Sequence, residues 1–291
     1  MKEAVLQQLR PDNVEVSISG DVPMSVLEKL SLTYLGTVPA ATTPRPDLPD
    51  DKLEAKVLGK AQQIGVYLPD NDERAMGYLA GSCPNPWGLY ADNSTVASAI
   101  TAISAKKDAI DPRRQHPLFG HLLLQVVQEV ANRRLFSVVR EERRLTYDAS
   151  FSLKGRDGIK GGWYLVSVTS SPQQVFEAVR ACKEALRSLR GPFGVMGDSV
   201  QSAKRSILNR FKTEMLTNKF WVENMSGSQT NNVPLKSMQS LTDFESVLAS
   251  ITVQDAQLMV ERLGFGDEDL TVCVGITSNA PPSSFGTAPA A

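Results

Sequence analysis

The chain passes from a helix into a strand within the stretch Leu135-Phe-Ser-Val-Val-Arg140-Glu-Glu-Arg-Arg-Leu-Thr-Tyr147-Asp-Ala-Ser150. Apolar residues at helical spacing run up to the paired arginines, and apolar and polar residues alternate from the following leucine onward. This spacing places Arg140 on the last turn of the helix and Tyr147 near the start of the strand. Two strong hydrogen-bond donors at one corner can hold a peptide carbonyl or an anionic tetrahedral intermediate. The structural alternative is a solvated arginine that complements the helix dipole and a tyrosine that packs in the strand.

Helices and strands follow one another on both sides of this corner. Downstream, the pattern predicts a hairpin of strands 147–153 and 163–169, and upstream a helix that opens at Pro117. Two earlier strands, 64–68 and 75–81, are joined by a charged turn and also look like a hairpin. The other predicted elements are helices 171–186, 198–225, 243–249 and 253–263, and a last strand, 269–276. We therefore expect an α+β fold, an antiparallel sheet with helices packed on one face.

The first 40 residues offer too little to fold alone. Residues 13–19 alternate as a strand does, residues 24–35 carry helical spacing, and a proline-rich linker follows. The strand pattern of 13–20 also recurs in 269–275, as expected for two copies of one domain type. One strand and one helix cannot form a core, so they predict the end of a preceding domain. The expected division is a domain tail (1–39), a linker (40–60), a complete domain (61–277) and a disordered tail (278–291).

Composition excludes several classes of protein. A net charge of −1 argues against a nucleic-acid binder, which would carry a basic face, and no run of 18 apolar residues predicts a membrane span. The N-terminus shows neither a secretory signal nor a transit-peptide pattern. Cys83, Cys182 and Cys273 are odd in number and far apart, which is typical of reduced thiols in a soluble intracellular or organellar protein.

Familiar catalytic motifs are absent from the sequence. His116 and His121 are five residues apart, whereas zinc peptidases place two histidines four apart or use His-x-x-Glu-His. Side chains five apart on a helix point in different directions, so we predict structural roles for both, with His121 against the core. Neither a Gly-x-Ser-x-Gly nucleophile turn nor a phosphate-binding glycine loop occurs. These residues predict no metal site and no cofactor site in this chain.

A set of motifs follows in a fixed order across about residues 10–277. They are Gly20-Asp-Val22, Leu35-Gly-Thr-Val-Pro39, Arg134-Leu-Phe136-x-x-x-Arg140-Glu141, Leu145-x-Tyr147, Gly162-Trp-Tyr164, Thr169-Ser-Ser-Pro172 and Leu270-Thr-Val-Cys-Val-Gly275. This order resembles the C-terminal half of the pitrilysin-like, or insulinase-family, zinc metallopeptidases. Within the family, His116-Pro-Leu-Phe119 and Leu145-Thr-Tyr-Asp148 are most similar to plastid members that remove transit peptides.

The resemblance implies a clamshell enzyme of four similar α+β domains in two halves. The N-terminal half would hold zinc and supply the base. The C-terminal half would close over the peptide as a lid, with Arg140 and Tyr147 donating hydrogen bonds to the substrate backbone. Its partners would be the zinc-bearing half and a peptide or precursor protein, in the chloroplast stroma. Alone, this chain would bind no catalytic zinc and cleave nothing. The alternative within the family is a non-catalytic member, a structural or peptide-binding subunit.

Arg144 departs from the family pattern, which usually has glycine immediately before Leu-x-Tyr. A helix that ends at this point often needs a positive φ at the residue after its cap, a conformation that disfavours any residue with a side chain. Either the helix ends differently, or Tyr147 is held at an altered angle. If φ is positive here, replacing Arg144 with glycine should raise the melting temperature.

Overall fold

The computed structural model describes residues 14–40, 42, 62–70, 73–83, 116–146, 148–155, 161–191, 193–226 and 237–279. Most of the predicted linker (40–60) and of the predicted C-terminal tail (278–291) lies outside these ranges, as does Tyr147. The architecture below refers to the described residues.

Five strands of the described chain form one sheet, in the order β1-β5-β2-β4-β3. Every neighbouring pair is antiparallel except β1 and β5, which run parallel. The predicted α+β fold with an antiparallel sheet is therefore confirmed, with one parallel pair at its edge. The strands are β1 (Gln63–Pro69), β2 (Arg74–Cys83), β3 (Asp148–Lys154), β4 (Gly162–Ser170) and β5 (Thr271–Ser278).

Of the two predicted hairpins, one is confirmed and one is wrong. β3 and β4 are antiparallel neighbours, with Phe151 opposite Val166. β1 and β2 are not neighbours, because β5 lies between them and pairs with both. The charged turn between β1 and β2 satisfies a local hairpin pattern, but the last strand of the chain takes the position between them.

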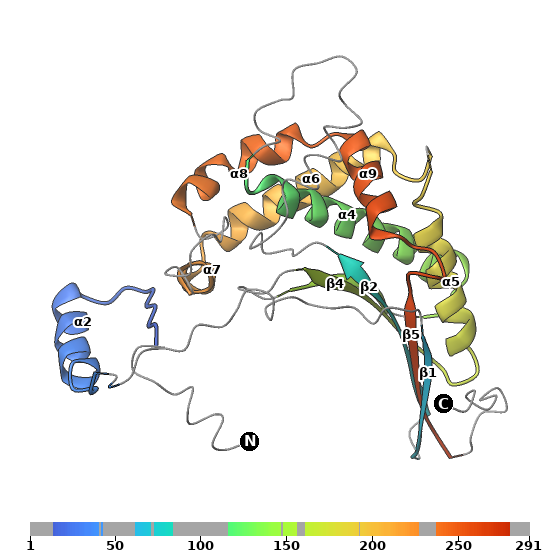
Figure 1. The fold of residues 1–291 in the computed structure, drawn as a ribbon, viewed down its shortest axis with the longest axis horizontal. Coiled ribbons are helices and arrows are strands. Elements are labelled where there is room, and N and C mark those ends of the chain that lie inside the picture. Colours follow the sequence, from blue (N-terminus) through green and yellow to red (C-terminus); the bar gives the residue numbers. More distant parts are fainter. Residues whose placement is uncertain are drawn as a thin grey trace.

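The helices cover one face of the sheet (Figure 1), with α4 and α5 packed against the strands. Every second residue of β2 is buried, from Ala75 to Cys83, as expected for a sheet with one covered face. The helices of this layer are α4 (Phe119–Leu135), α5 (Val175–Arg187), α6 (Gly197–Glu214), α7 (Asn218–Met225), α8 (Met238–Ser250) and α9 (Val253–Leu263).

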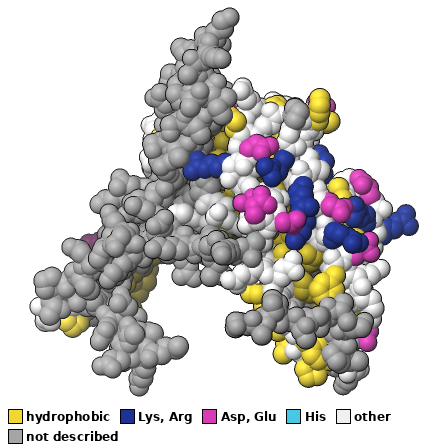
Figure 2. Space-filling model, turned by 45° about the vertical axis from the view of Figure 1, so that its right-hand side comes forward, with side chains coloured by type: hydrophobic (Ala, Val, Ile, Leu, Met, Phe, Trp, Pro, Cys, Tyr) yellow, Lys and Arg dark blue, Asp and Glu magenta, His cyan; other side chains and the backbone are white. Residues whose placement is uncertain are grey.

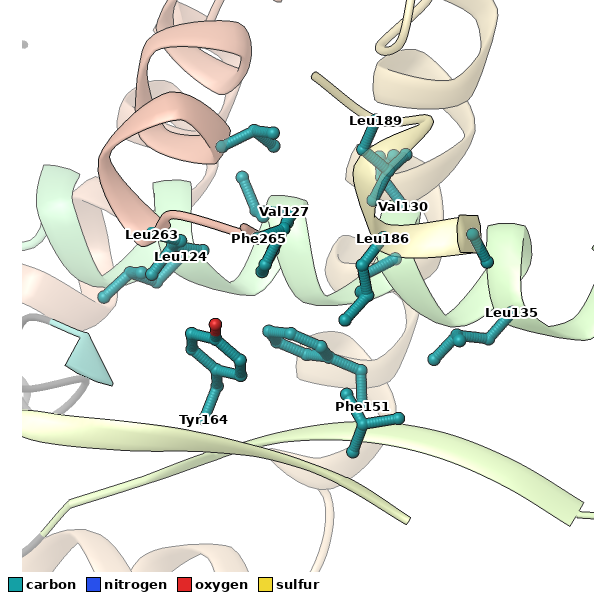
Figure 3. Close-up of a cluster of buried hydrophobic side chains, with 14 of the residues drawn as sticks. Leu124, Val127, Val130, Leu135, Phe151, Tyr164, Leu186, Leu189, Leu263 and Phe265 are labelled. Atoms are coloured by element: carbon teal, nitrogen blue, oxygen red, sulfur yellow. The ribbon is translucent and has the colours of Figure 1, made fainter. Parts of the chain in front are cut away.

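Three aromatic rings fill the space between the sheet and the helices. Phe151 of β3 and Tyr164 of β4 stack with centroids 5.3 Å apart, and Phe265 meets both rings edge-on. Figure 3 shows Phe151 and Tyr164 rising from the strands toward α4. The Tyr164 hydroxyl donates to the carbonyl of Gly264 at 2.9 Å, which satisfies its one polar group inside the core.

Two predicted elements differ from the structure. The predicted helix 198–225 is two helices. The first ends at Glu214, and extended Thr217 caps the second, its hydroxyl accepting from the Phe220 amide at 3.2 Å. The predicted strand 13–19 is wrong where it is described: residues 14–19 join no sheet, and Val16 stays 52 % exposed. A strand needs a neighbouring backbone to pair with, and the described residues provide none for this segment.

The helix predicted at 24–35 is present and changes character along its length. It forms α2 (Met24–Leu30) and continues as a π-helical turn, η2 (Ser31–Leu35). No residue of either part is buried, and Leu32 and Tyr34 are exposed by 66 % and 69 %. The described residues therefore give this helix no core to pack against.

Candidate functional site

The helix-to-strand corner is built on a widened helical turn. α4 passes into the π-helical segment η5 (Phe136–Glu142), which contains Arg140. The Arg143 amide donates to the Val138 carbonyl at 3.2 Å and the Leu145 amide to the Val139 carbonyl at 3.1 Å. These bonds close the helix end in the manner of a Schellman motif lengthened by one residue.

Arg144 has φ = +54°, and no other described residue with a side chain has a positive φ. The expectation that the chain needs a left-handed residue at this position is confirmed. The side chain of Arg144 is exposed. An L-residue in this conformation costs about 1–2 kcal/mol relative to glycine, because its Cβ approaches the following carbonyl oxygen. The surrounding structure therefore holds Arg144 in a conformation that its own side chain disfavours.

Neighbouring elements hold the corner in place. The Ser170 hydroxyl at the end of β4 donates to the Leu145 carbonyl at 2.8 Å. The Thr146 hydroxyl donates to the Thr169 carbonyl and accepts from the Asp148 amide at 3.0 Å. An ion pair between Arg143 and Glu184 joins the corner to α5. The backbone on both sides of position 147 is thus fixed to β4 and α5.

Arg140 differs from Arg133, Arg134 and Arg143 on this part of the chain. Arg133 donates to hydroxyl and carbonyl groups of α6, and Arg134 to groups in the segment between α5 and α6. Arg143 has its carboxylate partner. Among the described residues, Arg140 has no hydrogen-bond or ion-pair partner, and its guanidinium carbon lies 4.9 Å from the centre of the Phe136 ring. Its N–H donors remain available to a ligand.

The predicted pairing of Arg140 with Tyr147 stays a prediction, since Tyr147 lies outside the described residues. Arg140 is where the sequence places it, on the last turn before the strand. β3 begins at Asp148, one residue beyond the tyrosine. Sequence reasoning missed Phe136 as a neighbour of Arg140, although an aromatic residue four positions before an arginine on a helix is a signal for such a contact.

The two histidines act separately. Nδ1 of His116 accepts from the Leu118 amide at 3.1 Å, and its Nε2 lies 3.4 Å from an oxygen of Asp243. His121 is only 8 % exposed, as predicted, and lies 2.7 Å from the amide nitrogen of Gln125. Burial lowers the pKa of His121 to about 4, so its imidazole is neutral at physiological pH. No group of three potential metal ligands occurs among the described side chains, so this part of the chain does not fit a catalytic zinc.

The buried cysteines are poor nucleophiles. Cys83 on β2 and Cys182 on α5 are both buried, and burial raises the pKa of each thiol to about 12. The thiolate is the reactive form of cysteine, and at neutral pH almost none of it exists at these two positions. These thiols contribute to packing.

Side-chain amides of α4 close the outer edge of β3. The oxygen of Asn132 accepts from the Phe151 amide at 2.7 Å, and its nitrogen donates to the Phe151 carbonyl at 3.0 Å. Four residues earlier, Gln128 accepts from the Leu153 amide at 3.2 Å. Among the described strands, β3 is the last of the sheet on this side. An extended peptide could add to β3 only by displacing these amides.

Basic and acidic side chains are mixed over the surface near α5 (Figure 2). Lys183 and Arg187 both pair with Asp267, and Arg190 pairs with Glu261. Such exposed pairs contribute little to stability, but they leave this face without a large excess of one charge. In the described part of the chain, no helix has the length and hydropathy needed to cross a membrane.

Comparison with known proteins places the chain in a family. Residues 1–207 match the family model described as the peptidase M16 inactive domain. The chain belongs to the peptidase M16 family. The resemblance carried by the motifs is thereby confirmed.

Curated relatives of this M16 chain are chloroplast proteins. It is 36 % identical over 294 aligned residues to the stromal processing peptidase of Pisum sativum, and 32 % identical over 293 to that of Arabidopsis thaliana. These alignments cover 95 % of the chain but only 23 % of each relative. The chain thus spans less than a quarter of the length of these peptidases.

Solved structures confirm the fold. The peptidase M16 inactive domain from Pseudomonas fluorescens aligns with a TM-score of 0.58 at 14 % identity, covering 90 % of this chain and 52 % of that one. At this identity the similarity shows the architecture alone.

Proposed function

We propose that this chain is the C-terminal lid half of a metalloendopeptidase that processes extended peptides, including transit peptides. In this role it binds no zinc and supplies hydrogen-bond donors to the substrate backbone from Arg140 and Tyr147. Support comes from the inactive-domain family and from the stromal processing peptidases among its relatives.

The available donors of Arg140 carry the proposal. Arg133, Arg134 and Arg143 engage donors within the protein. Arg140 and Arg144 are both exposed and have no acceptor among the described residues, and Arg140 in addition lies against the Phe136 ring. A guanidinium presents five N–H groups in a planar fork, which suits a carbonyl or a developing oxyanion. A rigid corner that leaves such a group unpaired is suited to accept a ligand.

The zinc and the catalytic base would belong to a partner, the N-terminal half of the same gene product or a separate subunit. The described residues provide no metal-ligand group of their own. The second partner is the peptide or precursor protein that the two halves enclose. The compartment we propose is the chloroplast stroma, because the curated relatives are chloroplastic. Fractionation of plastids that express the full gene product tests this location.

The domain division is part of the proposal. Residues 1–39 would complete a preceding domain of the same type, residues 40–60 would link it to the domain 61–277, and 278–291 would form a tail. Support comes from α2 and η2, which bury no residue, and from the strand-like segment 14–19, which joins no sheet among the described strands. Deleting residues 1–60 should therefore leave the melting temperature of the main domain within about 2 °C, since little packing is lost. A fall of more than about 5 °C would contradict this division.

Reconstitution with a zinc-bearing N-terminal half tests the function. We expect no zinc in this chain alone, and cleavage of an extended presequence-like peptide only in the mixture. Replacing Arg140 and Tyr147 together by alanine should lower turnover by about 10²-fold or more, as when oxyanion donors are removed. Arg144→Ala is the matched control, an exposed arginine four positions away, and should leave turnover within about twofold.

Other outcomes of this experiment contradict specific parts of the proposal. Unchanged turnover in the double variant rules out the donor role. Zinc binding and cleavage by this chain alone overturn the assignment as a lid half.

The second candidate is a non-catalytic subunit that binds extended peptides or a partner half. The family description as an inactive domain favours it. Association with the N-terminal half without any gain in peptide cleavage would select this candidate over the lid half.

A further inference from the structure

Phe136 and Arg140 form a pair at the start of the π-helical turn. The guanidinium carbon lies 4.9 Å from the ring centre, within the roughly 6 Å that defines a cation–π contact. Residues four apart on a helix share a face, so the backbone itself brings the two side chains together. Phe136 is 43 % exposed and is absent from the buried core. The ring is therefore accessible to the side chain of Arg140.

The Phe136 ring restrains Arg140, whereas hydrogen bonds and an ion pair restrain Arg133, Arg134 and Arg143. Arg133, Arg134 and Arg143 are held by acceptors, which consume their donors. The arginine side chain has several rotatable bonds, so without an acceptor to hold it the guanidinium would sample many positions. Contact with an aromatic face restrains the guanidinium and leaves the N–H groups at its edge free.

We propose that Phe136 is a positioning residue for Arg140, a platform that holds its guanidinium ready for a substrate carbonyl. This inference rests on the proposed function, in which Arg140 contacts the substrate. The anchors of the corner fit this role, because Arg143 is tied to α5 and Leu145 to β4 immediately beyond the pair. The donors that act on a transition state contribute most when they are already in place before it forms.

The test is a double-mutant cycle in the reconstituted two-half enzyme, with kcat and KM measured on an extended presequence-like peptide. Phe136→Leu keeps an apolar side chain but removes the aromatic face. We expect kcat to fall by about 2- to 30-fold with KM changed by less than about twofold, the range that a cation–π contact supports. Phe136→Trp retains an aromatic face, and its kcat should stay near the parent value. In the Arg140→Ala background, Phe136→Leu should have no further effect.

The outcomes separate this inference from the proposed function. If Arg140→Ala leaves kcat unchanged, the proposed function fails, and this inference fails with it. If Arg140→Ala lowers kcat but Phe136→Leu does not, only the platform is refuted. The same holds if Phe136→Leu lowers kcat equally in both backgrounds, because the ring then acts independently of the arginine. Melting temperatures check folding, and Phe136→Trp supplies a second test if the leucine variant does not fold.

Discussion

Replacing Arg144 with glycine should stabilise the protein, against the usual effect of glycine. Arg144 has φ = +54°, and its exposed side chain has no hydrogen-bond or ion-pair partner among the described residues. Glycine removes a conformational cost of about 1–2 kcal/mol. Glycine also raises the conformational entropy of the unfolded chain, which lowers the free energy of unfolding by about 0.4–1 kcal/mol and opposes the gain. The net stabilisation therefore lies between about 0 and 1.6 kcal/mol, with a central value near 1 kcal/mol.

For a domain of about 200 residues, a stabilisation of this size raises the melting temperature by about 2–4 °C. Differential scanning calorimetry at fixed pH, with a urea titration to obtain the free energy of unfolding, measures it. Arg144→Ala is the control, because alanine keeps the Cβ atom that causes the strain and should give no increase. Arg143→Gly is a second control and should lower stability, since it breaks the ion pair with Glu184 where φ is −100°. A lower melting temperature for Arg144→Gly than for Arg144→Ala would refute the reasoning.

Three further predictions concern buried or closely packed groups. The folded protein holds His121 neutral with a pKa of about 4, against 6.5 as its ordinary value. As the pH falls, the unfolded chain therefore takes up the proton before the folded protein does, and the free energy of unfolding should drop by up to about 3 kcal/mol between about pH 6.5 and pH 4. In His121→Leu the melting temperature should depend less on pH over this range. Gly77→Ala should cost about 1–3 kcal/mol, measured by urea unfolding, because the new Cβ would overlap Val179 of α5. Gly275→Ala, where a Cβ would meet nothing within 4 Å, should cost much less. Asn132→Ala should lower stability by about 1–3 kcal/mol and increase light scattering at high protein concentration, because it exposes unpaired backbone groups of β3; unchanged values of both would contradict the role of this side chain.

Sequence patterns predicted helices and strands well where contacts between residues close in sequence determine the structure. Helical spacing up to the paired arginines and alternation after them located the corner, and the expected glycine position identified the strained residue Arg144. Each of these features depends on residues within a few positions of one another. The same holds for the β3–β4 hairpin, whose strands are joined by a short glycine-rich segment.

The sequence predictions were wrong where strand pairing depends on segments that are far apart in the chain. A charged turn suggested that β1 and β2 are partners, but β5, nearly 200 residues later, lies between them. Residues 14–19 have the alternation of a strand, yet the described residues provide no backbone to pair with them. The contact of Phe136 with Arg140 was accessible from spacing alone, whereas the bonds from Asn132 to β3 required the packing of α4 to be known.

The amide of Asn132 has the same chemical groups as a peptide bond. At Phe151 the Asn132 amide donates one hydrogen bond and accepts one, as a residue of a neighbouring strand would, and Gln128 accepts a further bond at Leu153. The sheet therefore ends on a copy of its own repeating unit, supplied by a helix. A second copy of the chain that added a strand to β3 would have to displace this helical residue, so we expect Asn132 to limit self-association at this edge. Mutational scans that search only strands for solubility determinants would miss it.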